Sequence, residues 1–290
     1  MKFNTDDHFV IGSEHISQGK PCQDHALSGL HEQIAYAVVS DGCSSGGLTD
    51  VGSRLITLST AAAIREHLNR DESGPGSLLA PIDVNGQQRN ILSGIKEILR
   101  LKSSDMLATS VYAYLSPSTG FVQVRGDGVV ALVRIDGSIT LIRYDWPNNT
   151  PFYPAYLDTD LALFVDAHGG DVKSAIVREE IVHYGTDGKI FSDPDLHTMH
   201  TITEGIEGIT TWLSMESLAY IAVFSDGVCR VDGFNWKDTA LQLMAFKSSE
   251  GVFAKRRMNA FIKNTHKVGK GPLDDIAYAV IHIKHEKGEM

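Results

Sequence analysis

Aspartates that directly follow apolar segments are the residues of this chain best suited to chemistry. Asp41 comes after the segment 34–40, which is apolar at nearly every position, and a turn rich in glycine and serine follows it. Asp226 comes after residues 220–225, again immediately before a glycine. An uninterrupted apolar run of this length is typical of a strand covered on both faces. We therefore expect two buried strands to end in carboxylates that share one site.

Further aspartates lie at other predicted boundaries between strands and turns, at Asp24, Asp127 and Asp274. Carboxylate oxygens without a neighbouring histidine favour Mg²⁺ or Mn²⁺ over Zn²⁺. Converging carboxylates repel one another strongly in a partly dry cleft, so such a cluster requires a cation. The Asp-Gly pairs that begin at Asp136 and Asp187 are assigned to turns alone.

The length and composition favour one domain over residues 1–290. The chain has 290 residues, of which 42% are hydrophobic, and this is ample for a large core. No segment has the composition of an interdomain linker. The breaks at 71–77 and 81–90 are rich in turn-forming residues, and we expect both to be surface loops between helices.

Charge and cysteine content narrow the classes of partner and compartment. A formal net charge of -10 argues against nucleic acid as a partner and favours a divalent cation. The three cysteines lack zinc-type spacing, and an odd count favours a reducing compartment. The first residues include acids where a secretion signal needs an apolar core, and no apolar run approaches membrane-spanning length. We expect a cytoplasmic protein that binds neither membranes nor nucleic acid.

The hydrophobic periodicity predicts an α+β protein. Residues 107–144 alternate with a period of two and predict an antiparallel meander, whereas 145–158 is aromatic and proline-rich and predicts an exposed flap. The other predicted strands are 8–12, 175–183, 208–213, 218–225 and 276–283, and the predicted helices are 49–69, 90–102, 235–246 and 252–264. Strands without regular helical crossovers indicate α+β rather than doubly wound α/β.

A series of short motifs then carries a family resemblance. In order, they are Gln23-Asp24, Val39-Ser40-Asp41-Gly42, Ala108-Thr109-Ser110-Val111, Gly126-Asp127-Gly128, Ser225-Asp226-Gly227 and Asp274-Asp275 before a strand. This series resembles the metal-dependent protein phosphatases of the PP2C family. The segments 12–16 and 21–24 are similar to its divergent bacterial branch. The resemblance implies a four-layer α/β/β/α sandwich with two central antiparallel sheets.

The same resemblance implies a site for two Mn²⁺ or Mg²⁺ ions and a weaker third. It assigns Asp41 as the ligand that bridges both ions, Asp24 and the carbonyl of Gly42 to one side, Asp226 and Asp274 to the other, and Asp127 to the third ion. Asp24 and Asp41 then act in catalysis through metal-bound water. The implied activity is the hydrolysis of phosphoserine and phosphothreonine in a protein that a serine/threonine kinase has phosphorylated, and hence a role in signalling.

Departures from the family pattern affect substrate binding. The position of the phosphate-binding arginine of the family is Gly19 here, so we expect Lys20, with His15, to hold the phosphate. Cys43 replaces the histidine that often follows the Asp-Gly pair, which leaves protonation of the leaving group unassigned. Gln23 replaces a glutamate and removes one negative charge from the metal surroundings.

Alternative functions remain open at this point. The missing arginine and histidine favour a catalytically silent relative that binds phosphoproteins. The segment 42–46 also fits the G-x-S-x-G pattern, with Ser44 as the nucleophile of a serine hydrolase and a late histidine such as His266 or His282 as its base. His197 and His200 could pair on a metal, but no third ligand has zinc-site spacing, and we expect a solvated loop there.

Overall fold

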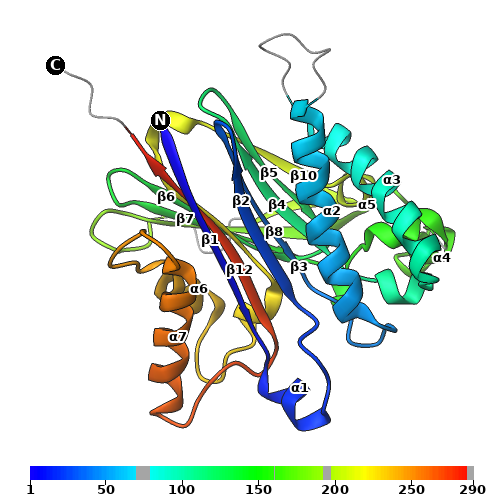
Figure 1. Ribbon diagram of the computed structural model, residues 1–290. Helices are drawn as coiled ribbons and strands as arrows, with labels where there is room; N and C mark the ends of the chain where they lie inside the picture. Colours follow the sequence, from blue (N-terminus) through cyan, green and yellow to red (C-terminus); the bar gives the residue numbers. More distant parts are fainter. Residues whose placement is uncertain (70–78, 160, 192–196, 286–290) are drawn as a thin grey trace.

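Two antiparallel β-sheets form the centre of the molecule in the computed structural model, which describes residues 1–69, 79–159, 161–191 and 197–285 (Figure 1). The first sheet has the order β1 (Lys2–Val10), β12 (Ile276–Lys284), β11 (Leu218–Phe224), β6 (Gly128–Arg134), β7 (Ile139–Asp145), β8 (Ala175–Tyr184) and β9 (His197–Thr201). The second has the order β10 (Ile209–Leu213), β5 (Gly120–Arg125), β4 (Ser110–Leu115), β3 (Ile34–Ser40) and β2 (His25–His31). We call them the first and the second sheet.

Helices cover the outer face of each sheet, as Figure 1 shows. Helices α2 (Thr49–Asn69) and α3 (Pro81–Leu99) pack on the second sheet, and α6 (Trp236–Met244) and α7 (Phe253–His266) pack on the first. The shorter helices are α1 (Ser13–Gln18), α4 (Leu161–Ala167) and α5 (Ile202–Glu207). None of the described helices is both long and apolar enough to cross a lipid bilayer. The predicted four-layer α/β/β/α sandwich is confirmed.

Strand β3 explains why its sequence has no polar face. Ala35, Ala37 and Val39 point into the core between the two sheets, whereas Tyr36 and Val38 point into the core beneath α2 and α3. Successive side chains of a strand point to opposite faces, so a strand at the centre of four layers must be apolar at every position. All its residues are accordingly buried.

The segment 107–144 forms alternating strands as predicted, but it does not form one meander. Strands β4 and β5 belong to the second sheet, and β6 and β7 belong to the first. The chain crosses between the sheets at Gly126-Asp127, where Gly126 and Gly128 have φ values of 105° and 146°. These conformations favour glycine, and they redirect the chain without interrupting the period of two.

Helix α3 begins nine residues earlier than its predicted start at 90, so residues 81–90 are helical and are not a surface loop. Pro81 occupies the first turn, where a missing N–H is harmless, and the Asp83 carboxylate accepts a hydrogen bond from the Ala80 N–H at 3.3 Å. Val84 and Gln88 are buried on the inner face. The predicted loop at 71–77 lies outside the described residues.

The segment 145–158 is packed into the protein and is not an exposed flap. Trp146 and Phe152 are 3% and 0% exposed, and both belong to the core between the sheets. The indole N–H of Trp146 donates to the Gly126 carbonyl at 2.8 Å, which ties the segment to the crossing between the sheets. The loop predicted around His197 and His200 is also wrong, because these residues form β9 and His200 contacts Glu179 at 2.7 Å.

The burial of Phe152 generates a stability prediction. Phe152→Ala should lower the free energy of unfolding by about 3–5 kcal/mol, because it removes a fully buried ring and leaves a cavity. The matched control is Phe191→Ala, since Phe191 is 68% exposed and its loss should cost less than about 0.5 kcal/mol. Urea unfolding followed by circular dichroism measures both. Equal effects of the two substitutions would contradict the packed position of the segment.

Candidate metal site

The strand register brings the predicted aspartates to one end of both sheets. His25 at the start of β2 pairs with Ser40 at the end of β3, so Asp24 and Asp41 emerge side by side. In the first sheet, Phe224 at the end of β11 pairs with Tyr278 near the start of β12, which places Asp226 beside residues 274–275. Val129 in β6 also pairs with Phe224, so the crossing at Asp127 reaches the same end.

Four aspartates form one carboxylate cluster, in which Asp24 and Asp127 are buried and Asp41 and Asp226 are half-buried. The charges of Asp24, Asp226 and Asp127 all act on the Asp41 carboxyl, which places Asp41 close to the other three. Asp24 and Asp127 are only 2% and 5% exposed. Burial, and then repulsion between like charges, raises the pKa of all four carboxyls. The four charged carboxylates therefore destabilise the folded state, and the rest of the structure must offset this repulsion.

The carboxylate cluster suits hard divalent cations. One oxygen of Asp24 and one of Asp127 are buried without a hydrogen-bond partner among the described residues. Each is an acceptor that a cation could satisfy, and oxygen-only ligands favour Mg²⁺ or Mn²⁺. Position 42 requires glycine, because a Cβ there would lie 2.7 Å from the Thr49 carbonyl oxygen. The cluster thus fits the metal that the sequence predicted.

Thr109 fixes the backbone of Asp41. Its hydroxyl accepts a hydrogen bond from the Asp41 N–H at 3.0 Å, and its own N–H donates to the Asp41 carbonyl at 2.9 Å. The hydroxyl of Ser40 donates to the Thr109 carbonyl at 2.6 Å. These bonds lock the end of β3 to the start of β4, so the Asp41 side chain has a defined origin.

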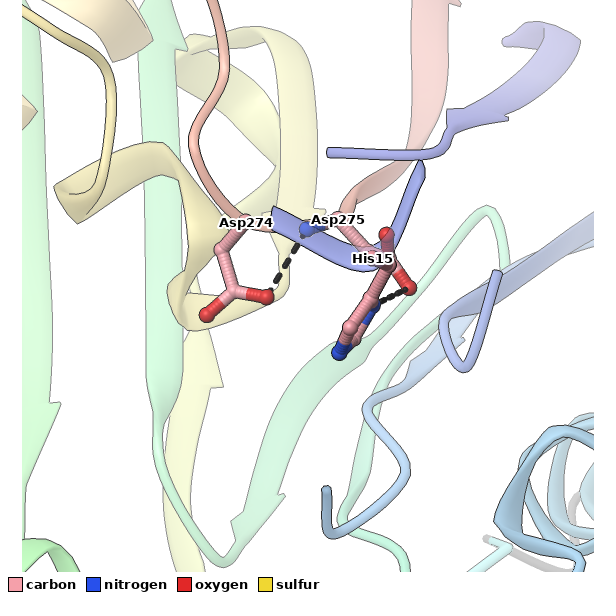
Figure 2. A group of neighbouring side chains, drawn as sticks. All are labelled: His15, Asp274 and Asp275. Atoms are coloured by element: carbon pink, nitrogen blue, oxygen red, sulfur yellow. Dashed lines mark hydrogen bonds and ion pairs between the residues drawn. The ribbon is translucent and has the colours of Figure 1, made fainter. Parts of the chain in front are cut away.

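Asp275 anchors the N-terminal segment to the site, as Figure 2 shows with His15 and Asp274. One oxygen of Asp275 accepts a hydrogen bond from the Gly12 N–H at 2.7 Å, and the other accepts from the Gln23 N–H at 2.6 Å and contacts His15 Nδ1 at 2.8 Å. Its oxygens are thus engaged by the protein, so Asp275 acts as a structural carboxylate that positions Asp24. The Gln23 side chain donates to Thr49 at 2.8 Å.

Asp274 lies at the rim of the carboxylate cluster. One of its oxygens accepts a hydrogen bond from the Asp275 N–H at 2.9 Å, and the other lies 3.5 Å from Nε of Arg230. Its charge contributes to the raised pKa of Asp226, which places the two carboxyls near each other. Arg230 also contacts Glu14 at 2.8 Å and is about half exposed. It is a cation at the rim that the sequence analysis did not identify.

The predicted phosphate-binding residues lie at the same end of the molecule. Lys20 is half-buried, and its ammonium group donates to the Ser44 carbonyl at 3.3 Å. His15 is buried, and its Nε2 lies 3.5 Å from the Ser44 hydroxyl. Cys43 is half-buried and contacts Ser45 at 3.2 Å. Both Lys20 and His15 thus lie against the turn that follows Asp41.

Tyr153 reaches the carboxylate cluster from the packed segment 145–158. It is 8% exposed, and burial, followed by the nearby charges of Asp41 and Cys43, raises the pKa of its phenol. The hydroxyl therefore stays protonated and can donate a hydrogen bond beside the site. No local pattern in the sequence indicated this role, since it depends on how the segment packs.

Comparison with known proteins agrees with this arrangement. A family model described as Protein phosphatase 2C matches residues 11–157, slightly more than half of the chain, and the chain belongs to this family. The resemblance found in the sequence is thus confirmed. A search of curated proteins gave no match.

Several solved structures share the fold. Over 98% of this chain and 96% of the other, the serine/threonine phosphatase Stp1 from Staphylococcus aureus superposes with a TM-score of 0.58 at 13% identity. The serine/threonine phosphatase PstP/Ppp from Mycobacterium tuberculosis superposes with a TM-score of 0.52 at 15% identity, and the match covers 98% of this chain and 100% of the other. The catalytic domain of PstP in complex with two manganese ions superposes with a TM-score of 0.51 at 16% identity, and the match covers 98% of this chain and 99% of the other. At such identities the likeness concerns the fold.

The central position of Asp41 generates a binding prediction. Asp41→Asn should abolish tight Mn²⁺ binding while the protein stays folded, because it removes charge from the carboxylate cluster and leaves the apolar core intact. Isothermal titration calorimetry measures binding, and circular dichroism checks the fold. Asp136→Asn is the matched control, since Asp136 lies in an exposed turn. Unchanged Mn²⁺ affinity in Asp41→Asn would refute the assigned role.

The raised pKa values generate a pH prediction. Between the unfolded-state pKa of about 4 and neutrality, the folded state keeps protons that the unfolded state has lost. Without metal, the free energy of unfolding contributed by the cluster should therefore fall as pH rises. Urea unfolding at about pH 5 and about pH 8 in EDTA should show a steeper fall for wild type than for Asp41→Asn. Saturating Mn²⁺ should make the free energy of unfolding of wild type nearly the same at the two pH values. In EDTA, an equally steep fall in wild type and in Asp41→Asn would contradict the prediction.

Proposed function

We propose that the protein is a Mn²⁺- or Mg²⁺-dependent phosphatase that acts on phosphoserine and phosphothreonine in proteins. The carboxylate cluster carries this proposal, because one oxygen of Asp24 and one of Asp127 are buried without a hydrogen-bond partner among the described residues and the charges of the cluster repel. A protein that only bound phosphoproteins would have no use for a cluster of carboxylates that destabilises its folded state. The substrates would be proteins that a serine/threonine kinase has phosphorylated.

The residues divide between the ions as follows. Asp24 and the Gly42 carbonyl would hold one ion, Asp226 and Asp274 the other, with Asp41 shared and Asp127 holding a weaker third. When bound, such a pair of cations supplies a nucleophilic water at neutral pH and neutralises charge on the phosphoryl group. Thr109 and Asp275 orient the ligands through the hydrogen bonds to Asp41 and to the segment before Asp24.

The phosphate of the substrate would be bound at the rim of the carboxylate cluster. Lys20 offers an ammonium group beside the turn at Ser44, and His15 lies behind that turn. Arg230 offers a guanidinium that can form two hydrogen bonds to phosphate, although Glu14 and Asp274 now share it. We propose Lys20 as the main contact and His15 as the residue that supports the turn.

One observation favours a serine hydrolase as a second candidate. Ser44, His15 and Asp275 form a chain of contacts of 3.5 and 2.8 Å, in the order nucleophile, base and acid. The late histidines expected from the sequence are not needed for it. This arrangement does not account for the unpartnered carboxylates of Asp24 and Asp127, so the phosphatase is preferred.

Hydrolysis of a phosphothreonine peptide with and without Mn²⁺ tests the function directly. Wild type should release phosphate only with the metal, and Ser44→Ala should stay within about fivefold of wild type, because the attack comes from water. Asp41→Asn should be inactive. Peptide binding without turnover would favour the silent binder, whereas covalent labelling of Ser44 by a fluorophosphonate would favour the serine hydrolase.

The role of Lys20 is tested by its two substitutions. Lys20→Ala should raise KM for the phosphopeptide about ten- to hundredfold with little change in kcat, since a charge-assisted hydrogen bond is worth about 1.5–3 kcal/mol. Lys20→Arg should retain binding. It is a better replacement than an arginine at position 19, because Gly19 has a φ of 64° and a side chain there is strained.

Steady-state kinetics at saturating Mn²⁺ measure these effects. Lys263→Ala on the exposed face of α7 is the control and should leave KM unchanged. If Lys20→Ala leaves KM unchanged and Arg230→Met raises it, then Arg230 is the phosphate contact and the assignment to Lys20 is wrong.

A further inference from the structure

A cavity of about 620 Å³ lies in the outer layer of the second sheet. Helix α3, strand β5, helix α5 and the segment after Tyr153 form its walls. Helix α2 packs mainly on β2 and β3, so the outer face of the sheet near β5 and β10 is left for this cavity. None of the predicted metal ligands lines it. Its volume is typical of sites that bind small molecules.

Arg125 contributes a buried positive charge to the wall of this cavity. Its side chain is 3% exposed, and its Nε has no hydrogen-bond partner among the described residues. Its guanidinium lies over the ring of Phe152 at 5.6 Å from the centroid. A guanidinium stays protonated in proteins at neutral pH, so Arg125 carries a positive charge. Within the described part of the chain, no carboxylate forms an ion pair with it.

The other charged groups of the cavity are already engaged or exposed. Arg89 forms an ion pair with Asp158 at 2.6 Å, and the ammonium of Lys96 donates to Ser103 at 2.7 Å. Glu207 is exposed. A buried charge without a partner is costly, and the cation–π contact with Phe152 offsets only part of that cost. The arrangement of the cavity thus leaves one anion-binding group unsatisfied.

The rest of the wall is mainly apolar, with contributions from Ile56, Leu92, Met106, Ala155 and Leu157. Such a wall packs against a hydrocarbon or aromatic body and gives it no hydrogen bonds. A guanidinium matches the geometry of a carboxylate and forms two parallel hydrogen bonds with it. The two features therefore select a ligand with one acidic end and an apolar body.

We propose that this cavity binds a small amphipathic carboxylate, whose acidic group pairs with Arg125 and whose apolar body fills the space beneath α3. This binding is separate from phosphate hydrolysis and does not depend on the proposed function.

Glycines of helix α3 allow the cavity to be filled without disturbing the fold. Gly86 lines the cavity, and a Cβ added there would meet no atom within 4 Å. Gly94 lies in the same helix with equally open space, but it does not line the cavity. Leucine at either position favours the helix, so both variants should fold. Gly86→Leu is thus a blocking variant, and Gly94→Leu is its matched control.

The test uses 1-naphthoate and 1-naphthamide as probes, because they share a shape and differ in charge. Isothermal titration calorimetry on the full-length protein should give a Kd for the naphthoate at least about tenfold below that for the amide. Arg125→Met should remove this preference. Gly86→Leu should weaken naphthoate binding at least about tenfold, whereas Gly94→Leu should leave it within about twofold of wild type.

Three results would overturn the proposal. They are no naphthoate binding to wild type at millimolar concentration, equal affinity for the two probes, and full binding in Gly86→Leu. The naphthoate affinity of Gly86→Leu remains decisive even if Arg125→Met does not fold. Phosphatase activity enters none of these measurements, so the outcome is independent of the catalytic assignment.

Discussion

Repulsion between carboxylates at the shared end of the two sheets is the constraint around which this fold is organised. Burial raises the pKa of Asp41 and of the aspartates around it, so their convergence must be enforced by the rest of the structure. Burial of the apolar strands β3 and β11 stabilises this convergence, since each strand is covered on both faces. The hydrogen bonds of Thr109 and Asp275 then fix the backbone on either side of the site.

The strand ends were predictable because they depend on local patterns. An apolar run that stops at Ser-Asp-Gly marks both the burial of the strand and the start of the polar site, as at Asp41 and Asp226. The layer order followed from the family resemblance and is confirmed. The long helix α2 and the last strand also matched, because their hydrophobic periods are regular over many residues.

The features that the sequence did not reveal depend on contacts between distant segments. The crossing at Gly126-Asp127 keeps a period of two, so nothing local separates one sheet from two. Tyr153 lies in an irregular aromatic stretch whose burial is a tertiary effect. The first turns of α3 contain Asn85 and Gly86, which are weak helix formers, and packing of Val84 and Gln88 overrides their preference.

The pairing of β1 with β12 has a consequence for synthesis of the protein. Lys2 pairs with Lys284, and β12 lies between β1 and β11 in the finished sheet. While the chain is still being translated, β1 has no partner in its sheet and the first sheet is open where β12 will insert. Asp275, which holds the segment before Asp24 in place, is also made late. The carboxylate cluster can therefore assemble only after the residues up to Lys284 have left the ribosome, and a nascent chain that is shorter than this lacks the strand that completes the first sheet.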